Sequence, residues 1–120
     1  MKLNKENIIA QKTFAFALNI VKLYRSIVND QKEYVLSKQL LRSGTSIGAS
    51  VKEAEHAQSK KDFINKMNVA LKEANETEYW LQLLFDSEFI SEADYKLISQ
   101  DILEILRLLI SIVKTSKNNL

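Results

Sequence analysis

Two residues of this chain have a spacing that could hold a metal ion. Glu53 and His56 form one Glu-x-x-His motif, and a spacing of three residues places both side chains on one face of a helix. Di-iron carboxylate proteins of the ferritin type need two such motifs and two further glutamates, whereas this chain has 1 histidine. Glu73 and Glu76 do not restore the second motif. The sequence therefore predicts no metal site and no cofactor, and a ferritin-like metalloprotein is the less favoured alternative.

Gly44 and Gly48, the two glycines of the chain, raise the question of a phosphate-binding loop. A P-loop needs a lysine and then a serine or threonine directly after its last glycine, but Ala49 and Ser50 follow Gly48. A dinucleotide-binding loop needs three glycines after a strand, and the sequence has neither feature. Without cysteine or a serine–histidine pairing that the spacing supports, we predict that the protein is not an enzyme. The glycines are better placed inside a helix, where they permit close approach of a neighbouring element.

The elements that position these residues are predicted to be four helices. The chain has no proline, and three helix starts are marked by a capping side chain with an acidic residue three positions later: Asp30 with Glu33, Ser59 with Asp62, and Ser91 with Asp94. We predict helices over 5–28, 31–57, 60–87 and 92–117. Because the connections are short, successive helices should be antiparallel neighbours. The expected fold is all-α, an antiparallel up-down-up-down four-helix bundle in a single domain over residues 1–120.

Apolar residues recur at helical spacing in every predicted helix. The two middle helices have ordinary core stripes, consisting of Leu36, Leu40, Ile47, Val51 and Ala54, and of Phe63, Met67, Ala70, Ala74, Leu81 and Phe85. The first and last helices exceed the roughly three apolar positions in seven that a bundle helix needs. In the last helix, Ile98, Ile102, Ile105, Leu109 and Ile112 form the main face, and Leu108 lies well outside it. We expect a second copy of the chain to cover the excess, which predicts a homo-oligomer.

A polar face on the second helix can be aligned with one on the third. With a turn near residue 59, facing positions of these antiparallel helices sum to about 118. Arg42 is then level with Glu76, and Ser46 is level with Glu73. If the two faces turn toward each other, Arg42 and Glu76 form a partly buried bidentate pair. Such a pair more often specifies register than catalyses a reaction, so we predict a structural polar cluster.

Charge is unevenly distributed along the chain, whose formal net charge is +2. Residues 62–94 carry two basic and eight acidic groups, whereas the segments before and after them are net basic. We find no signal-peptide pattern and no uncharged stretch long enough to span a bilayer. Together with the absence of cysteine, this predicts a cytoplasmic protein that does not enter a membrane.

The stretch "RSGTSIGASVKEAEHAQSKKDFINKMNVALKEANETEYWLQLL" resembles the 23S ribosomal RNA intervening-sequence protein family. The matching residues are Arg42, Ser43, Ser46, Ile47, Glu53, Lys60, Lys61, Phe63, Ala70, Leu71, Glu76 and the segment "YWLQLL". Ser50, Val51 and Ala54 depart from the asparagine, isoleucine and glycine that are usual in the family. These motifs cover residues 42–85, and the flanking helices agree in pattern.

The resemblance implies a four-helix bundle that assembles as a ring, commonly a pentamer. The family includes the accessory variability determinants of diversity-generating retroelements, which are basic and bind nucleic acid beside a reverse transcriptase. Other members are encoded within ribosomal RNA insertions.

We therefore expect a non-enzymatic oligomer that binds RNA or DNA weakly and without sequence preference. The candidate phosphate contacts are Lys5, Lys12, Lys22, Arg25, Lys38, Lys52, Lys114 and Lys117. A protein-interaction module, whose acidic third helix docks a basic partner, remains an open alternative.

Overall fold

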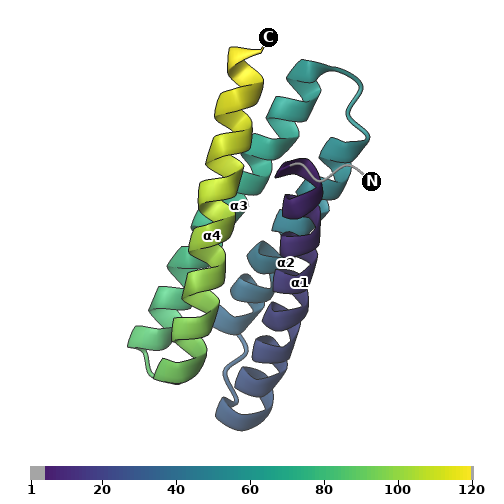
Figure 1. Ribbon diagram of the computed structural model, residues 1–120. Helices are drawn as coiled ribbons and strands as arrows, with labels where there is room; N and C mark the ends of the chain where they lie inside the picture. The colour runs from purple at the N-terminus through teal and green to yellow at the C-terminus, as the bar shows by residue number, and fades with distance from the viewer. Residues whose placement is uncertain (1–4, 120) are drawn as a thin grey trace.

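The computed structural model describes residues 5–119, which form four long helices that alternate in direction (Figure 1). The elements are α1 (Lys5–Ser26), a short π-helical segment η1 (Ile27–Gln31), α2 (Leu36–Glu55), α3 (Lys60–Asp86) and α4 (Glu92–Asn118). Each helix packs against its neighbour in the chain, and α4 also packs against α1. The predicted all-α, up-down-up-down four-helix bundle is confirmed. In this arrangement the start of α1, the α2–α3 connection and the end of α4 meet at one end of the bundle.

The starts of α3 and α4 agree with the predictions from sequence. Ser59 Oγ accepts a hydrogen bond of 3.1 Å from the backbone N–H of Asp62, and α3 begins at Lys60. Ser91 Oγ accepts a hydrogen bond of 3.1 Å from the backbone N–H of Asp94, and α4 begins at Glu92. These caps succeed because each satisfies a first-turn N–H group within the same local segment.

The junction between α1 and α2 differs from the prediction. Asp30 does not cap a helix; its carboxylate accepts a hydrogen bond of 3.3 Å from the hydroxyl of Ser26. Buried Ile27 continues the core stripe of α1 into η1, and the chain reverses at Lys32, whose φ is 54°. The second helix therefore begins at residue 36 rather than 31.

Glu33 performs the capping that the sequence assigned to Asp30. Its carboxylate accepts hydrogen bonds of 3.0, 2.9 and 2.8 Å from the backbone N–H groups of Val35, Leu36 and Ser37. Burial raises the pKa of Glu33, but these three hydrogen bonds and one from the Ser37 side chain together outweigh it and hold the pKa below the ordinary value. The anion at the start of α2 is also favoured by the helix dipole.

The core contains the predicted stripes, with differences at their edges. All predicted positions of α2 are buried except Leu36, and those of α3 are buried except Phe63 and Phe85, which are partly exposed. The five isoleucine and leucine residues of the main α4 face are buried, as expected. Leu108, which the periodicity placed well outside that face, is partly buried against the core. The reason is that α4 contacts both α3 and α1, so its buried arc is wider than one stripe.

Candidate functional site

The polar faces of α2 and α3 turn toward each other and bring Arg42 between two carboxylates. Arg42 Nη2 lies 2.5 Å from Oε2 of Glu76, and Arg42 Nη1 lies 3.1 Å from Oε2 of Glu73. The Arg42 side chain is 47% exposed and that of Glu76 is 38% exposed, whereas Glu73 is 14% exposed. The hydrogen bond to Glu76 and the charge of both carboxylates raise the pKa of Arg42, against a smaller effect of burial.

This arrangement differs in two details from the pair expected from sequence. The guanidinium does not grip Glu76 in a bidentate manner; it divides its two terminal nitrogens between Glu76 and Glu73, because these glutamates lie one turn apart on α3. Ser46 is level with Glu73 but takes no part in the cluster. Its hydroxyl donates to the carbonyl of Arg42 at 2.6 Å, one turn back on its own helix.

A buried hydroxyl contact beneath this cluster was not anticipated. Thr77 Oγ1 and Ser43 Oγ, from α3 and α2, are 3.0 Å apart and form a hydrogen bond, and both residues are fully buried. Thr77 Oγ1 also lies 2.7 Å from the carbonyl oxygen of Glu73. The level pairing of α2 with α3 was a partial signal, since it places Ser43 level with Asn75, within one turn of Thr77. The buried and exposed contacts together fix the register of the two helices.

Four of the predicted phosphate contacts gather at one end of the bundle. Lys5, Lys52, Lys114 and Lys117 lie where the start of α1, the end of α2 and the end of α4 meet (Figure 1). Lys5 Nζ is within 2.5 Å of Ser111 Oγ, and Lys52 Nζ is 3.6 Å from Glu55 Oε2.

The same end contains three lysines that the phosphate-contact prediction omitted. Lys60, Lys61 and Lys66 lie in the first two turns of α3. The pair of lysines directly after the α2–α3 turn was the signal that could have found them. We name the seven residues together the lysine-rich end: Lys5, Lys52, Lys60, Lys61, Lys66, Lys114 and Lys117.

The other predicted phosphate contacts do not join this group. Lys12 lies about two turns into α1 and pairs with Glu104 of α4 at 2.5 Å, so its charge is already compensated. Lys22, Arg25 and Lys38 lie at the opposite end of the bundle, near the α1–α2 junction. The lysines of α1 do not form one surface, because residues 5 and 22 are separated by roughly 25 Å along the helix.

Charge is therefore polarised along the bundle axis. At the lysine-rich end, residues 5–9, 50–67 and 111–119 carry seven lysines and four acidic residues. At the opposite end, residues 22–38 and 85–101 carry five basic and seven acidic residues, and we name this the acidic end. In sequence order the charged residues of each end belong to different segments of the chain. Only the antiparallel packing of the helices brings them together.

The Glu-x-x-His motif lies at the exposed end of α2. Glu53 and His56 are both exposed. Within residues 5–119, no group of three or more His, Cys, Asp or Glu side chains is placed to hold a metal ion. Over the same residues, no helix has the length and apolar character needed to cross a membrane.

The sequence model of a known family covers most of this chain. The model for the 23S rRNA-intervening sequence protein matches residues 5–111. The chain belongs to this family. The resemblance predicted from residues 42–85 is thus confirmed, and it extends into α1 and α4.

A solved structure agrees with the family assignment and with the fold. It is the crystal structure of a protein of unknown function from the S23 ribosomal protein family of Bacteroides thetaiotaomicron VPI-5482. That chain is 59% identical to this one, the match covers 92% of this chain and 99% of that chain, and the TM-score is 0.91. No functionally curated protein matches the chain.

Proposed function

We propose that this member of the 23S rRNA-intervening sequence protein family is a non-enzymatic, cytoplasmic homo-oligomer that associates with RNA or DNA through its lysine-rich end. The observation that carries the proposal is the polarised charge, because seven lysines at one end form a more concentrated positive surface than the net charge of +2 suggests. Phosphate contacts carry no sequence information, so the expected binding is weak and nonspecific.

Exposed apolar side chains support self-association. Phe14 and Leu18 of α1 are 67% and 50% exposed. Phe14 borders an apolar hollow of about 500 Å³ between α1 and α2, whose lining includes Ala17, Gly48 and Ala49. Small side chains on one wall and a bulky aromatic on the rim suit a partner surface that inserts between them. The face that contains Phe14 and Leu18 is the proposed contact between copies.

The proposed assembly is a ring of five chains, the number that the family resemblance implies. Cyclic symmetry repeats the lysine-rich end once in every chain. Several weak phosphate contacts can then act on one nucleic acid at the same time, which raises the overall affinity without any new contact. The proposal thus joins the two surfaces, since self-association would make a modest positive patch effective.

Arginine and glutamate at the α2–α3 contact support a structural rather than a catalytic role. Arg42 is neutralised by Glu73 and Glu76, and its hydrogen bonds to them join two helices. The hydroxyls of Ser43 and Thr77 are buried against each other, so neither is presented to a substrate. These groups fix the register of α2 and α3. A catalytic nucleophile would instead need to be accessible to a substrate and activated by a neighbouring base.

The nucleic-acid proposal is tested by fluorescence anisotropy with labelled single-stranded RNA and duplex DNA. We expect binding that weakens steeply between about 50 and 200 mM salt. The variant Lys60→Glu/Lys61→Glu should weaken binding about tenfold or more, since it reverses two charges at the lysine-rich end. Glutamate is favourable in the first turn of a helix, so this variant should remain folded.

The matched control is Lys22→Glu/Lys38→Glu, which changes the net charge equally at the opposite end. It should lower the affinity by less than about threefold, because screening limits the reach of exposed charges to roughly 10 Å. Equal losses of affinity in the two variants would show that nucleic-acid binding does not depend on the lysine-rich end. An intact oligomer that binds neither probe at low salt would reject nucleic-acid association.

Self-association is tested by multi-angle light scattering at micromolar concentration. The wild-type mass should be five times the 13.8 kDa of one chain. Phe14→Glu/Leu18→Glu should give a folded species of lower mass, because both side chains are exposed within one chain. Val35→Glu, at a 72% exposed apolar position elsewhere, should leave the mass unchanged. A monomeric wild-type protein would contradict the proposal.

A further inference from the structure

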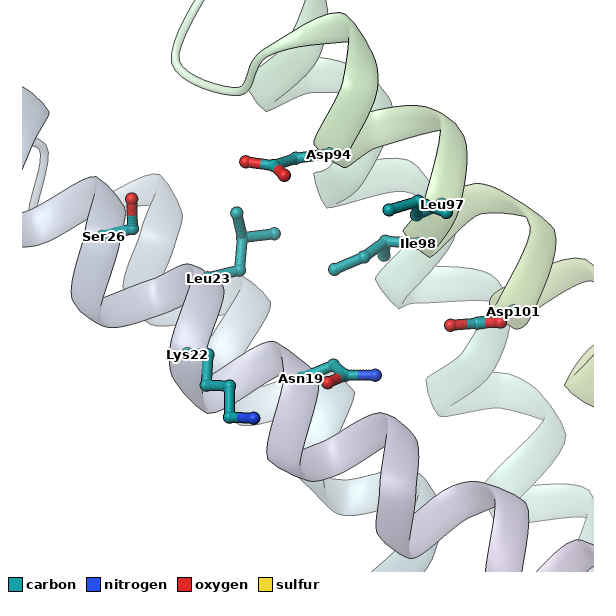
Figure 2. Close-up of a pocket in the computed structure, with 8 residues that line it drawn as sticks. All are labelled: Asn19, Lys22, Leu23, Ser26, Asp94, Leu97, Ile98 and Asp101. Atoms are coloured by element: carbon teal, nitrogen blue, oxygen red, sulfur yellow. The ribbon is translucent and has the colours of Figure 1, made fainter.

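A groove separates the first and last helices at the acidic end of the bundle. It has a volume of about 420 Å³ and lies between the end of α1 and the start of α4. Figure 2 shows Leu23 of α1 and Ile98 of α4 pointing toward each other across it. Both residues are buried, and they form an apolar floor. A second hollow of about 140 Å³ shares Asn19 and Asp101 with the first, so the groove continues along the α1–α4 contact.

The α4 wall of this groove combines an exposed apolar side chain with two carboxylates. Leu97 is 65% exposed and lies between Asp94 and Asp101 in sequence. These aspartates are seven residues apart, so they lie on one face of α4 with a separation of about 10 Å along the helix axis. Figure 2 shows both carboxylates directed toward α1. Within residues 5–119 neither forms an ion pair.

The charge of the groove selects its partner. Two uncompensated carboxylates face one basic residue of the groove lining, Lys22 on the α1 wall, and the surrounding end of the bundle is net acidic. A nucleic acid would be repelled from this wall. A helix with apolar side chains on one face and basic side chains along one edge would match it in both respects.

We propose that the α1–α4 groove binds a basic amphipathic helix of another protein. Apolar side chains of that helix enter above the floor formed by Leu23 and Ile98 and pack against exposed Leu97, from whose surface they displace water. Lysine or arginine side chains two turns apart along one edge pair with Asp94 and Asp101. This inference goes beyond the proposed function, because it needs neither nucleic acid nor contact between copies of the chain.

The asymmetry of the walls also sets the orientation of the partner. The basic edge of the bound helix must face α4, because Lys22 on the α1 wall repels it. Further along the α1–α4 contact, Lys12 and Glu104 line the second hollow and form an ion pair, so Glu104 is compensated and does not add to the acidic wall. The groove thus offers two carboxylates rather than three.

The test uses a fluorescein-labelled synthetic peptide of about 18 residues, long enough to form a helix in complex. It carries leucines at helical spacing on one face and lysines two turns apart along one edge. Two control peptides replace the lysines with glutamates or scramble the leucine positions at constant composition. We expect saturable anisotropy for the lysine peptide alone, and backbone NMR shifts concentrated at Leu23, Leu97 and Ile98.

The matched protein variants separate the groove from the general acidic field. Asp94→Asn/Asp101→Asn should weaken peptide binding about tenfold, because two charge-assisted contacts are lost. Asp86→Asn/Glu92→Gln removes two charges at the same end outside the groove and should weaken binding by less than about threefold. Leu97→Asp should abolish binding while circular dichroism and oligomer mass remain unchanged, since Leu97 is exposed.

Three results would overturn the inference. The first is absence of saturable binding of the lysine peptide to the wild-type protein. The second is an equal loss of affinity in the two charge variants, which would show that the acidic end acts as a diffuse field. The third is a change of oligomer mass in Leu97→Asp, which would assign the groove to a second copy of this chain.

Discussion

Gly44 of α2 packs directly against Ile20 of α1. A Cβ atom added at Gly44 would lie 2.9 Å from both γ carbons of Ile20, and Ile20 is completely buried. These γ carbons are attached to a β-branched centre with one strongly preferred rotamer in a helix, so they cannot swing aside. The absence of a side chain at Gly44 is therefore what allows α1 and α2 to approach at this level.

The first prediction concerns the two glycines. Gly44→Ala gains about 1 kcal/mol of helix propensity, but the clash with Ile20 should exceed it and give a net loss of about 1–2 kcal/mol. Gly48→Ala is the matched control, since its Cβ would meet the backbone oxygen of Thr13 at 3.4 Å, an ordinary contact, and it should keep the propensity gain and be more stable than wild type by up to about 1 kcal/mol. Urea unfolding measures both. A Gly44→Ala protein that is more stable than wild type would show that α1 and α2 move apart at this level without a significant cost in stability.

The second prediction concerns the Arg42 cluster. Arg42→Ala should lower the free energy of unfolding by about 1–2 kcal/mol, because Glu73 is mostly buried and loses its partner. The half-exposed guanidinium makes this smaller than the loss for a buried ion pair. Arg42→Ala combined with Glu76→Gln should cost less than the sum of the two single changes. Strictly additive losses in denaturant titrations would mean that the two side chains do not interact.

The third prediction concerns pH and the cap at Glu33. The pKa of Glu33 is lowered in the folded protein, so its ionised form stabilises α2 fully when the pH is above 4.5, the ordinary pKa of a glutamate. This stabilisation is lost as the pH falls through the lowered pKa. Glu33→Gln should therefore be less stable than wild type by about 1 kcal/mol at pH 7, with a smaller difference at low pH. Thermal unfolding across this range measures the difference, with Asp30→Asn as the control. A difference that is independent of pH would argue against capping by the anion.

The fourth prediction concerns metal. The sequence contains one Glu-x-x-His motif, formed by Glu53 and His56, and no second motif of this kind. Purified protein should therefore contain no stoichiometric iron, manganese or zinc. Elemental analysis tests this directly. About one metal ion per chain, lost in His56→Ala, would overturn the prediction and favour the metalloprotein alternative.

The helices, their order and their core stripes were predictable because their causes are local. Ser59 and Ser91 cap N–H groups three residues away, and the apolar period reports which side of each helix is buried. Short connections then leave few topologies. The cap at Glu33 was missed because Asp30 and Glu33 are both suitable capping residues in sequence. The helical path continues past Ser26 to Gln31, so Asp30 lies inside it and Glu33 is left to cap α2.

The contacts between helices required the tertiary structure. The sequence placed Arg42 level with Glu76, but the division of its guanidinium between Glu76 and Glu73 depends on how far each helix is rotated about its axis. The polarised charge and the α1–α4 groove arise between segments far apart in the chain, since antiparallel packing places the start of one helix beside the end of another. Local sequence determines a helix and its apolar face, whereas rotation, register and the fit of side chains are decided only when all four helices pack.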